Sequence, residues 1–161
     1  MCYCAQKNDY YTIMKNIAII LSGGVGSRMG SKIPKQYIEI GGKPVIAYCL
    51  EQFANHRRID AVIIALAAEW RSFVSDLLVV KTMRQPLYFA NQGETRQHSI
   101  YNALKCAKEQ GYNDEDIVII HDAARPMVDS EIIDDCLNGC KLYDGAIASI
   151  DVKDTIYVGD D

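Results

Sequence analysis

The chain has 161 residues, which suits one domain because a second full hydrophobic core would not fit in this length. Hydrophobic residues make up 49% and charged residues 24%, the balance of a folded globular protein. The net charge is −4, from 17 Lys and Arg against 21 Asp and Glu, which argues against nucleic acid as the main partner. No apolar run approaches the ~18 residues of a membrane-spanning helix, so we expect no membrane partner.

Strand-like and helix-like patterns alternate along the chain. Continuous apolar runs are typical of strands buried on both faces of a sheet, and spacings of three or four residues are typical of amphipathic helices. In chain order, the sequence predicts a strand at 17–21, a helix at 45–55, a strand at 61–66, a helix at 69–78, a strand at 86–90, a helix at 97–110, a strand at 117–121, a helix at 130–143, and strands at 146–150 and 155–158.

This alternation predicts an α/β chain, a three-layer, Rossmann-like arrangement with helices on both faces of a mainly parallel sheet. We expect the domain to span residues 15–161, after a disordered lead-in over residues 1–14 that has no patterned structure and no apolar core of a secretory signal. The chain stops directly after the strand-like segment 155–158, which predicts a protein truncated at its C-terminal end.

Six cysteines raise the question of a disulfide framework or a metal site. Four of them, from Cys49 to Cys140, fall on apolar helical faces, where a free thiol packs as a small hydrophobic group. No Cys-x-x-Cys pair occurs, and the three histidines show no zinc-like spacing with the cysteines. We therefore expect reduced cysteines in a cytoplasmic protein.

A glycine-rich loop, SGGVGSRMGS at residues 22–31, follows the first predicted strand. Such a loop lets the backbone approach a ligand closely at the carboxyl end of a strand. It is not a dinucleotide fingerprint, which would need glycine at Met29, and it lacks the GK[ST] ending of a Walker A loop. Two cations, Arg28 and Lys35, lie in and after the loop. Together with backbone donors they favour a polyphosphate site, and a glycine turn without a ligand is the alternative.

Three segments resemble, in the same order, the motifs of one enzyme family. Residues 21–37, LSGGVGSRMGSKIPKQY, resemble the signature loop of the nucleotide-diphospho-sugar transferase fold. The PKQY ending is typical of cytidylyltransferases that act on methylerythritol 4-phosphate or ribitol 5-phosphate. GETRQHS at 93–99 resembles the family's second nucleotide segment, and HDAARP at 121–126 resembles its central acidic motif. Asp154-Thr155 resembles the acceptor-site pair that opens the family's dimerisation arm.

The resemblance implies a reaction in which CMP is joined from CTP to a sugar-alcohol phosphate and pyrophosphate leaves. A phosphate monoester has its second pKa at about 6, so the nucleophile needs no general base at pH 7. The difficulty is to bring two polyanions together and to stabilise extra charge on the α-phosphate. The resemblance implies that Arg28 and Lys35 are the catalytic residues for this task, with Mg²⁺ bridging the triphosphate oxygens.

The other nucleotide contacts are carried over from the same motifs. The resemblance implies that glycine-loop backbone wraps the phosphates, while backbone near Ser22 and Gly93 and the Ser99 hydroxyl bind the cytosine. The expected nucleotide-binding residues are Ser22, Gly23, Gly24, Gly26, Gly93, Arg96 and Ser99. The alternative for Ser99 is a residue of a helix's first turn whose hydroxyl bonds to local backbone.

The acceptor site is expected around the third motif. Asp122 follows a buried strand, where a carboxylate is costly unless it serves a cation or a hydroxyl. The resemblance implies that Asp122, Arg125 and Thr155 bind the acceptor, with Mg²⁺ binding as the alternative for Asp122. An ion pair between Asp122 and Arg125 that only orders the loop is the structural alternative.

The chain departs from the family in features that leave the acceptor open. Members are much longer, and the part beyond this chain carries another active-site lysine. Ser22-Gly23-Gly24 stands where methylerythritol enzymes have an alanine pair, and together with Trp70 it favours ribitol phosphate, whereas HDAARP is common in methylerythritol enzymes. We expect CTP and a polyol phosphate as partners, and a homodimer in the full-length protein. A truncated CTP-binding module without turnover, or a sugar-1-phosphate nucleotidyltransferase using another base, are the competing hypotheses.

Overall fold

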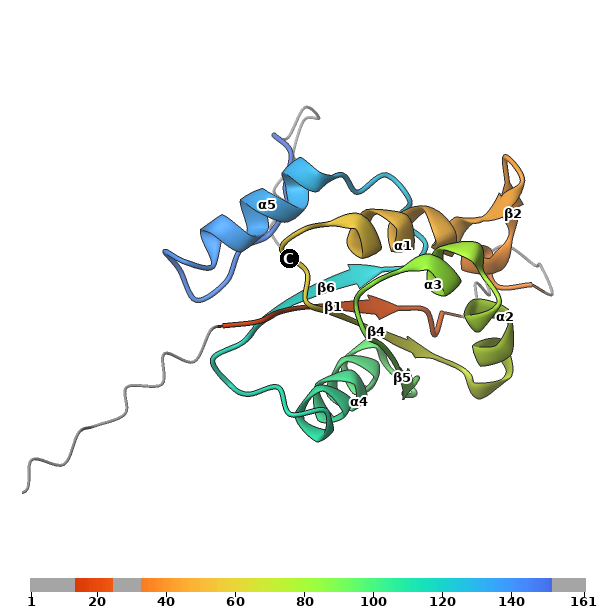
Figure 1. The fold of residues 1–161 in the computed structure, drawn as a ribbon, viewed down its shortest axis with the longest axis horizontal. Helices are drawn as coiled ribbons and strands as arrows, with labels where there is room; N and C mark the ends of the chain where they lie inside the picture. Colours follow the sequence, from red (N-terminus) through yellow and green to blue (C-terminus); the bar gives the residue numbers. More distant parts are fainter. Residues whose placement is uncertain (1–13, 25–32, 152–161) are drawn as a thin grey trace, which may run out of the picture.

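A computed structural model describes residues 14–24 and 33–151 of the chain (Figure 1). At its centre lies a four-stranded sheet in which all pairings between neighbouring strands are parallel. Across the sheet, the strands are β5 (Leu87–Asn91), β4 (Ala61–Leu66), β1 (Asn16–Leu21) and β6 (Ile117–Asp122). This sheet confirms the predicted α/β architecture, and its four strands match predicted ones to within one residue at each end.

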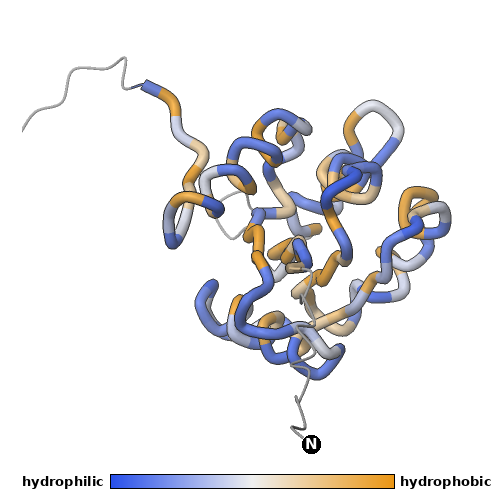
Figure 2. Tube along the Cα trace, turned by 60° about the vertical axis from the view of Figure 1, so that its left-hand side comes forward, coloured by the Kyte–Doolittle hydropathy of each residue, from blue (hydrophilic) through white to orange (hydrophobic). Residues whose placement is uncertain are grey.

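Helices cover both faces of the sheet, because successive side chains of a strand point to opposite faces. Ile20 packs in the core on one face, and its neighbour Ile19 packs in the core on the other. One face carries α1 (Val45–Asn55), α2 (Arg71–Ser75), α3 (Leu78–Thr82) and α5 (Ser130–Gly139), and the other carries α4 (Arg96–Glu109). Figure 2 shows hydrophobic residues gathered along the strands between these layers.

The helix predicted at 69–78 is not continuous. The chain forms a 3-10 turn, η3 (Ala68–Trp70), then the short helices α2 and α3, with Leu77 in an extended conformation between them. Leu77, Val79 and Val80 pack against the core of this face. Because the helix breaks, Val79 and Val80, which follow the predicted helix, also pack against the core. The spacing of apolar residues over 69–78 could not indicate this break.

The strand predicted at 146–150 is wrong. These residues form no ladder, and the side chains of Ile147 and Ile150 are 91% and 89% exposed. An apolar run forms a strand only where a neighbouring strand can pair with its backbone N–H and C=O groups. The run itself does not show whether such a neighbour exists. Helix α5 also ends at Gly139, with turns in place of the predicted helix up to 143. The segments 1–13 and 155–158 lie outside the described residues.

The four cysteines in the described ranges are free thiols. Cys49 is fully buried in α1, and burial raises the pKa of its thiol to about 12. It therefore packs as a neutral apolar group, as the sequence predicted. Within the described ranges, no helix has the length and apolar character needed to cross a membrane.

A second 3-10 turn, η2 (Lys35–Tyr37), and a small hairpin of β2 (Glu39–Ile40) and β3 (Lys43–Pro44) lead into α1. The hairpin turns through Gly41 and Gly42, whose φ angles of 60° and 85° are readily adopted only by glycine. The backbone N–H of Val45 donates to the Ile38 carbonyl and ties the hairpin to the start of the helix. The PKQY segment lies near the carboxyl end of β1, because the Gln36 Nε2 donates to the Ser22 carbonyl at 2.8 Å.

The connection from β5 to α4 passes very close to the first turn of that helix. Thr95 caps the helix, with its hydroxyl oxygen accepting a hydrogen bond from the His98 N–H at 3.1 Å. A Cβ atom on Gly93 would lie 2.3 Å from the His98 Cβ and 2.9 Å from the Ser99 nitrogen. Position 93 therefore has no room for a side chain. Glycine lets the connection lie directly against the first turn of α4.

We expect Gly93→Ala to lower the free energy of unfolding by about 1–3 kcal/mol, because the added methyl group must displace helix backbone. Gly24→Ala is the matched control, since a Cβ at Gly24 meets nothing within 4 Å among the described residues. The control should change stability by no more than about 0.5 kcal/mol. Urea unfolding followed by circular dichroism measures both variants, and equal losses would contradict the steric role of Gly93.

Candidate nucleotide-binding site

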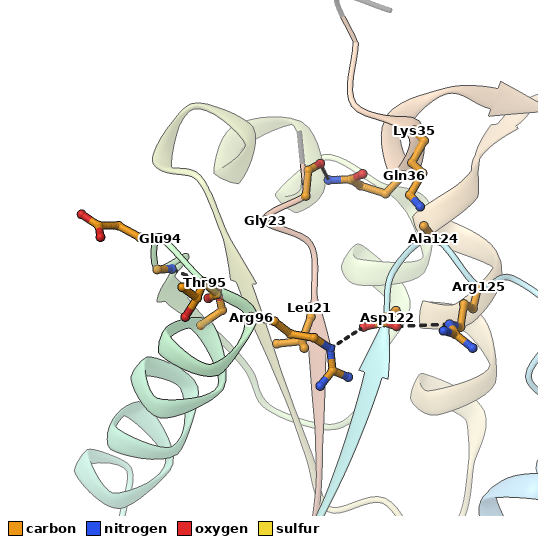
Figure 3. A pocket seen from close by; sticks show the side chains of 13 residues that line it. Leu21, Gly23, Lys35, Gln36, Glu94, Thr95, Arg96, Asp122, Ala124 and Arg125 are labelled. Atoms are coloured by element: carbon orange, nitrogen blue, oxygen red, sulfur yellow. Dashed lines mark hydrogen bonds and ion pairs between the residues drawn. The ribbon is translucent and has the colours of Figure 1, made fainter. Parts of the chain in front are cut away.

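A pocket of about 430 Å³ lies at the carboxyl ends of β1 and β6, between η2 and the start of α4 (Figure 3). In parallel α/β sheets, ligands bind at this end of the strands. The pocket collects residues from all three motifs that the sequence singled out. The predicted residues that line it are Gly23, Gly24, Lys35, Gly93, Arg96, Ser99, Asp122 and Arg125.

Other predicted residues do not line this pocket. Ser22 is 2% exposed, its N–H donates to the Ala65 carbonyl at 2.8 Å, and its hydroxyl donates to the Tyr37 oxygen at 2.8 Å. It lies directly behind the pocket wall. Gly26, Arg28 and Thr155 lie outside the described residues.

Three further polar residues line the pocket, Gln36, Glu94 and Thr95. Sequence reasoning did not select any of them as a site residue. A signal was present, because each lies inside a motif already quoted, Gln36 in PKQY and the other two in GETRQHS. The Glu94 carboxylate points away from the other labelled side chains of the pocket (Figure 3).

Aromatic side chains support the wall of the pocket from behind. The rings of Tyr37 and Trp70 stack with centroids 4.0 Å apart, and Phe73 meets both rings edge-on at 5.7 Å. Burial raises the pKa of the Tyr37 hydroxyl, so it stays protonated and serves as a hydrogen-bonding group. The stack fixes η2 and, with it, the positions of Lys35 and Gln36.

Asp122 lies between two arginines that come from different elements. Its Oδ1 accepts from the Arg96 Nε at 3.3 Å, and its Oδ2 accepts from the Arg125 Nε at 3.1 Å (Figure 3). The ion pair between Asp122 and Arg125, predicted from the sequence as the structural alternative, is thus present. Arg96 forms a second ion pair with the same carboxylate. Within the described ranges, the terminal nitrogens of both guanidinium groups make no hydrogen bond, so they can donate to an anion.

His121 holds the loop that carries Arg125. Its Nε2 lies 2.9 Å from the Arg125 carbonyl oxygen, to which the protonated nitrogen donates, and its ring packs against Phe53 at 5.3 Å. Burial lowers the pKa of this imidazole, which favours the neutral form. The placement agrees with the interpretation of His121 as a strand-end residue and gives it no contact with the pocket.

The Ser99 hydroxyl is engaged with backbone on both sides. It accepts from the Gly93 N–H at 2.9 Å and donates to the Thr95 carbonyl at 3.1 Å. This is the local bonding weighed as the alternative role for Ser99. In this arrangement the hydroxyl shapes the turn at 93–95, which itself lines the pocket.

Comparison with known proteins places these motifs in a family. The family model described as IspD, 2-C-methyl-D-erythritol 4-phosphate cytidylyltransferase, matches residues 16–161. The chain is 35% identical, over 92% of its length, to ribitol-5-phosphate cytidylyltransferase of Streptococcus agalactiae and covers 62% of that protein. It is 37% identical, over 90% of its length, to 2-C-methyl-D-erythritol 4-phosphate cytidylyltransferase of Lachnospira eligens and also covers 62% of that protein.

The fold is also that of a solved structure. The chain superimposes on the crystal structure of a 4-diphosphocytidyl-2C-methyl-D-erythritol synthase with a TM-score of 0.72 and 26% identity, over 92% of this chain and 65% of that one. The chain thus spans about three fifths of the length of the curated relatives it matches, 62% in both cases above. Motifs, fold and family model agree, and the chain belongs to the IspD cytidylyltransferase family.

Proposed function

We propose that this chain contains the catalytic nucleotide site of a cytidylyltransferase, which transfers CMP from CTP to a sugar-alcohol phosphate and releases pyrophosphate. The observation that carries the proposal is one pocket in which glycine-loop backbone, a lysine and two arginines converge at the carboxyl ends of the strands. Such a set of donors suits two polyanions in one site. Family membership supports the same chemistry.

On the nucleotide side, we assign the phosphates to the glycine loop and to Lys35. Lys35 lines the pocket from η2, opposite the first turn of α4. A lysine supplies a compact positive charge, which stabilises the additional negative charge on the α-phosphate in the transition state. Arg28 is assigned the same task from the resemblance alone. The cytosine is assigned to the turn at Gly93 and Glu94, in which Ser99 orders the backbone.

On the acceptor side, we assign the phosphate or polyol to Asp122 and Arg125, with Thr155 from the resemblance. The Asp122 carboxylate accepts hydrogen bonds and is already aligned by two guanidinium groups. It can therefore orient a hydroxyl of the acceptor while Arg125 offers its terminal nitrogens to an anion. Arg96 lies beside the same carboxylate, so it joins the nucleotide segment to the acceptor loop.

Mg²⁺ is proposed as the metal that accompanies the triphosphate. Within the described ranges, no group of three His, Cys, Asp or Glu side chains is placed to hold a metal ion. The pocket offers the carboxylate of Asp122. Mg²⁺ is commonly bound by one or two carboxylates together with substrate phosphates, so this donor set fits an ion that arrives with CTP. When bound, the ion would neutralise charge on the phosphate oxygens.

The acceptor stays open between two polyols, because relatives named for each are similarly distant at 35% and 37% identity. We also propose a cytoplasmic location and a homodimer for the full-length protein, as the resemblance implies. The second candidate is a CTP-binding module without turnover.

The proposal predicts release of pyrophosphate from CTP and Mg²⁺ only when an acceptor is present. Ribitol 5-phosphate, 2-C-methyl-D-erythritol 4-phosphate and no acceptor are compared in a coupled pyrophosphate assay, with ATP as the control nucleotide. The polyol that supports release identifies the substrate. If neither polyol supports pyrophosphate release in a sample that binds CTP, the result would support the binding module. A preference for ATP over CTP would contradict the proposed cytidylyltransferase activity.

Lys35→Ala is expected to reduce turnover by about 10²- to 10³-fold, because it removes a cation that acts on transition-state charge. Lys35 is exposed, so the free energy of unfolding should change by no more than about 0.5 kcal/mol. Lys105→Ala, at an exposed position on α4, is the matched control and should leave turnover unchanged. Comparable losses of turnover and stability in Lys35→Ala would contradict the assigned role.

A further inference from the structure

Gln36 makes contacts that its place in the pocket lining does not require. Its side chain is 2% exposed, and its Nε2 donates to two carbonyls of the glycine loop, that of Ser22 at 2.8 Å and that of Gly24 at 3.0 Å. Figure 3 shows the amide reaching across from η2 toward the chain at Gly23. One side chain thus holds both ends of a three-residue segment.

These bonds fix the direction of the backbone donors between them. A trans peptide group is planar, so the Gly23 N–H points away from the Ser22 carbonyl and therefore away from Gln36. With both flanking carbonyls held, the peptide group between Gly23 and Gly24 has little freedom to rotate. Within the described ranges, nothing accepts a hydrogen bond from the N–H of Gly23 or Gly24. Among the described residues these donors have no partner, so a ligand can accept hydrogen bonds from them.

The clamp is needed because the segment that it holds contains two consecutive glycines, Gly23 and Gly24. Glycine adopts a wider range of φ and ψ than other residues, so an unrestrained Gly23-Gly24 segment would spread its N–H groups over many directions. Ser22 is held a second time, because the Tyr37 hydroxyl donates to its carbonyl at 3.3 Å and accepts from its side chain at 2.8 Å. The Tyr37–Trp70 stack fixes that hydroxyl in turn.

We propose that Gln36 is a positioning residue that presets the N–H donors of the glycine loop for the triphosphate of the nucleotide. The inference rests on the nucleotide site proposed above and adds to it the group that orders the loop. Gln36 need not touch the substrate to act, because its effect passes through the carbonyls of Ser22 and Gly24. Preorganised donors gain affinity because less ordering remains when the ligand binds.

Two substitutions remove the clamp in different ways. Gln36→Glu keeps the shape but places a carboxylate against two carbonyls, and Gln36→Met keeps the volume without any donor. Each is expected to weaken CTP binding by about 10- to 100-fold, the effect of leaving buried polar groups unpaired. Gln85→Glu is the matched control, because Gln85 also donates to a backbone carbonyl, that of His56 at 3.5 Å, before the start of β5.

Calorimetric titration with CTP and Mg²⁺ measures affinity, and thermal unfolding shows which variants are folded. Amide NMR follows the Gly23 and Gly24 resonances without nucleotide, where both Gln36 variants should shift them and Gln85→Glu should not. Unchanged glycine resonances in a folded Gln36 variant would overturn the clamp, whatever the ligand. Equal CTP affinity of wild type and Gln36 variants would overturn its role in binding. Absence of CTP binding by the wild type would instead contradict the proposed function, with the NMR comparison still testing the clamp.

Discussion

The parallel pairing of β1 with β6 sets Leu21 directly opposite Asp122, and the pocket depends on this register. Two chain segments that are a hundred positions apart leave the sheet side by side, one as a glycine loop and the other as an acidic turn. A slip by one residue would turn both connections toward the wrong face, because side chains alternate along a strand. The buried Ile and Ala side chains that lock the two faces of the sheet therefore also determine the chemistry at its edge.

Around that edge, the site is built from polar groups that satisfy one another. Ser22 and Gln36 are each about 2% exposed, and every contact described for them is with backbone or a buried hydroxyl. Asp122 and its two arginines form the exposed counterpart on the other side of the pocket. Buried networks of this kind are rigid, whereas exposed ion pairs contribute little stability and exchange partners easily. The pocket thus combines a rigid wall at Ser22 and Gln36 with an ion-paired wall at Asp122 that an anion can rearrange.

Much of this could be predicted from the sequence. The buried strands and α1 follow from apolar runs and helical spacing. The glycine loop and the PKQY, GETRQHS and HDAARP motifs led to most of the lining residues. The broken helix at 69–78 and the missing strand at 146–150 could not be predicted, because both depend on which surface lies nearby. The same holds for the contact of Arg96 with Asp122, 26 positions away, which exists only through the strand register. Gln36 lies in PKQY but was missed as a site residue, because its partners are backbone carbonyls, whose positions the sequence does not show.

The stack behind the pocket has a consequence for how this protein can be observed. Trp70 is the chain's single tryptophan, and its indole ring lies 4.0 Å from the ring of Tyr37, whose hydroxyl bonds to Ser22 at the start of the glycine loop. The emission of an indole depends on its immediate surroundings, so the intrinsic fluorescence of the folded chain originates a few bonds from the loop. The protein therefore carries its own optical probe of this wall, and ligand-induced changes there can be followed without any label.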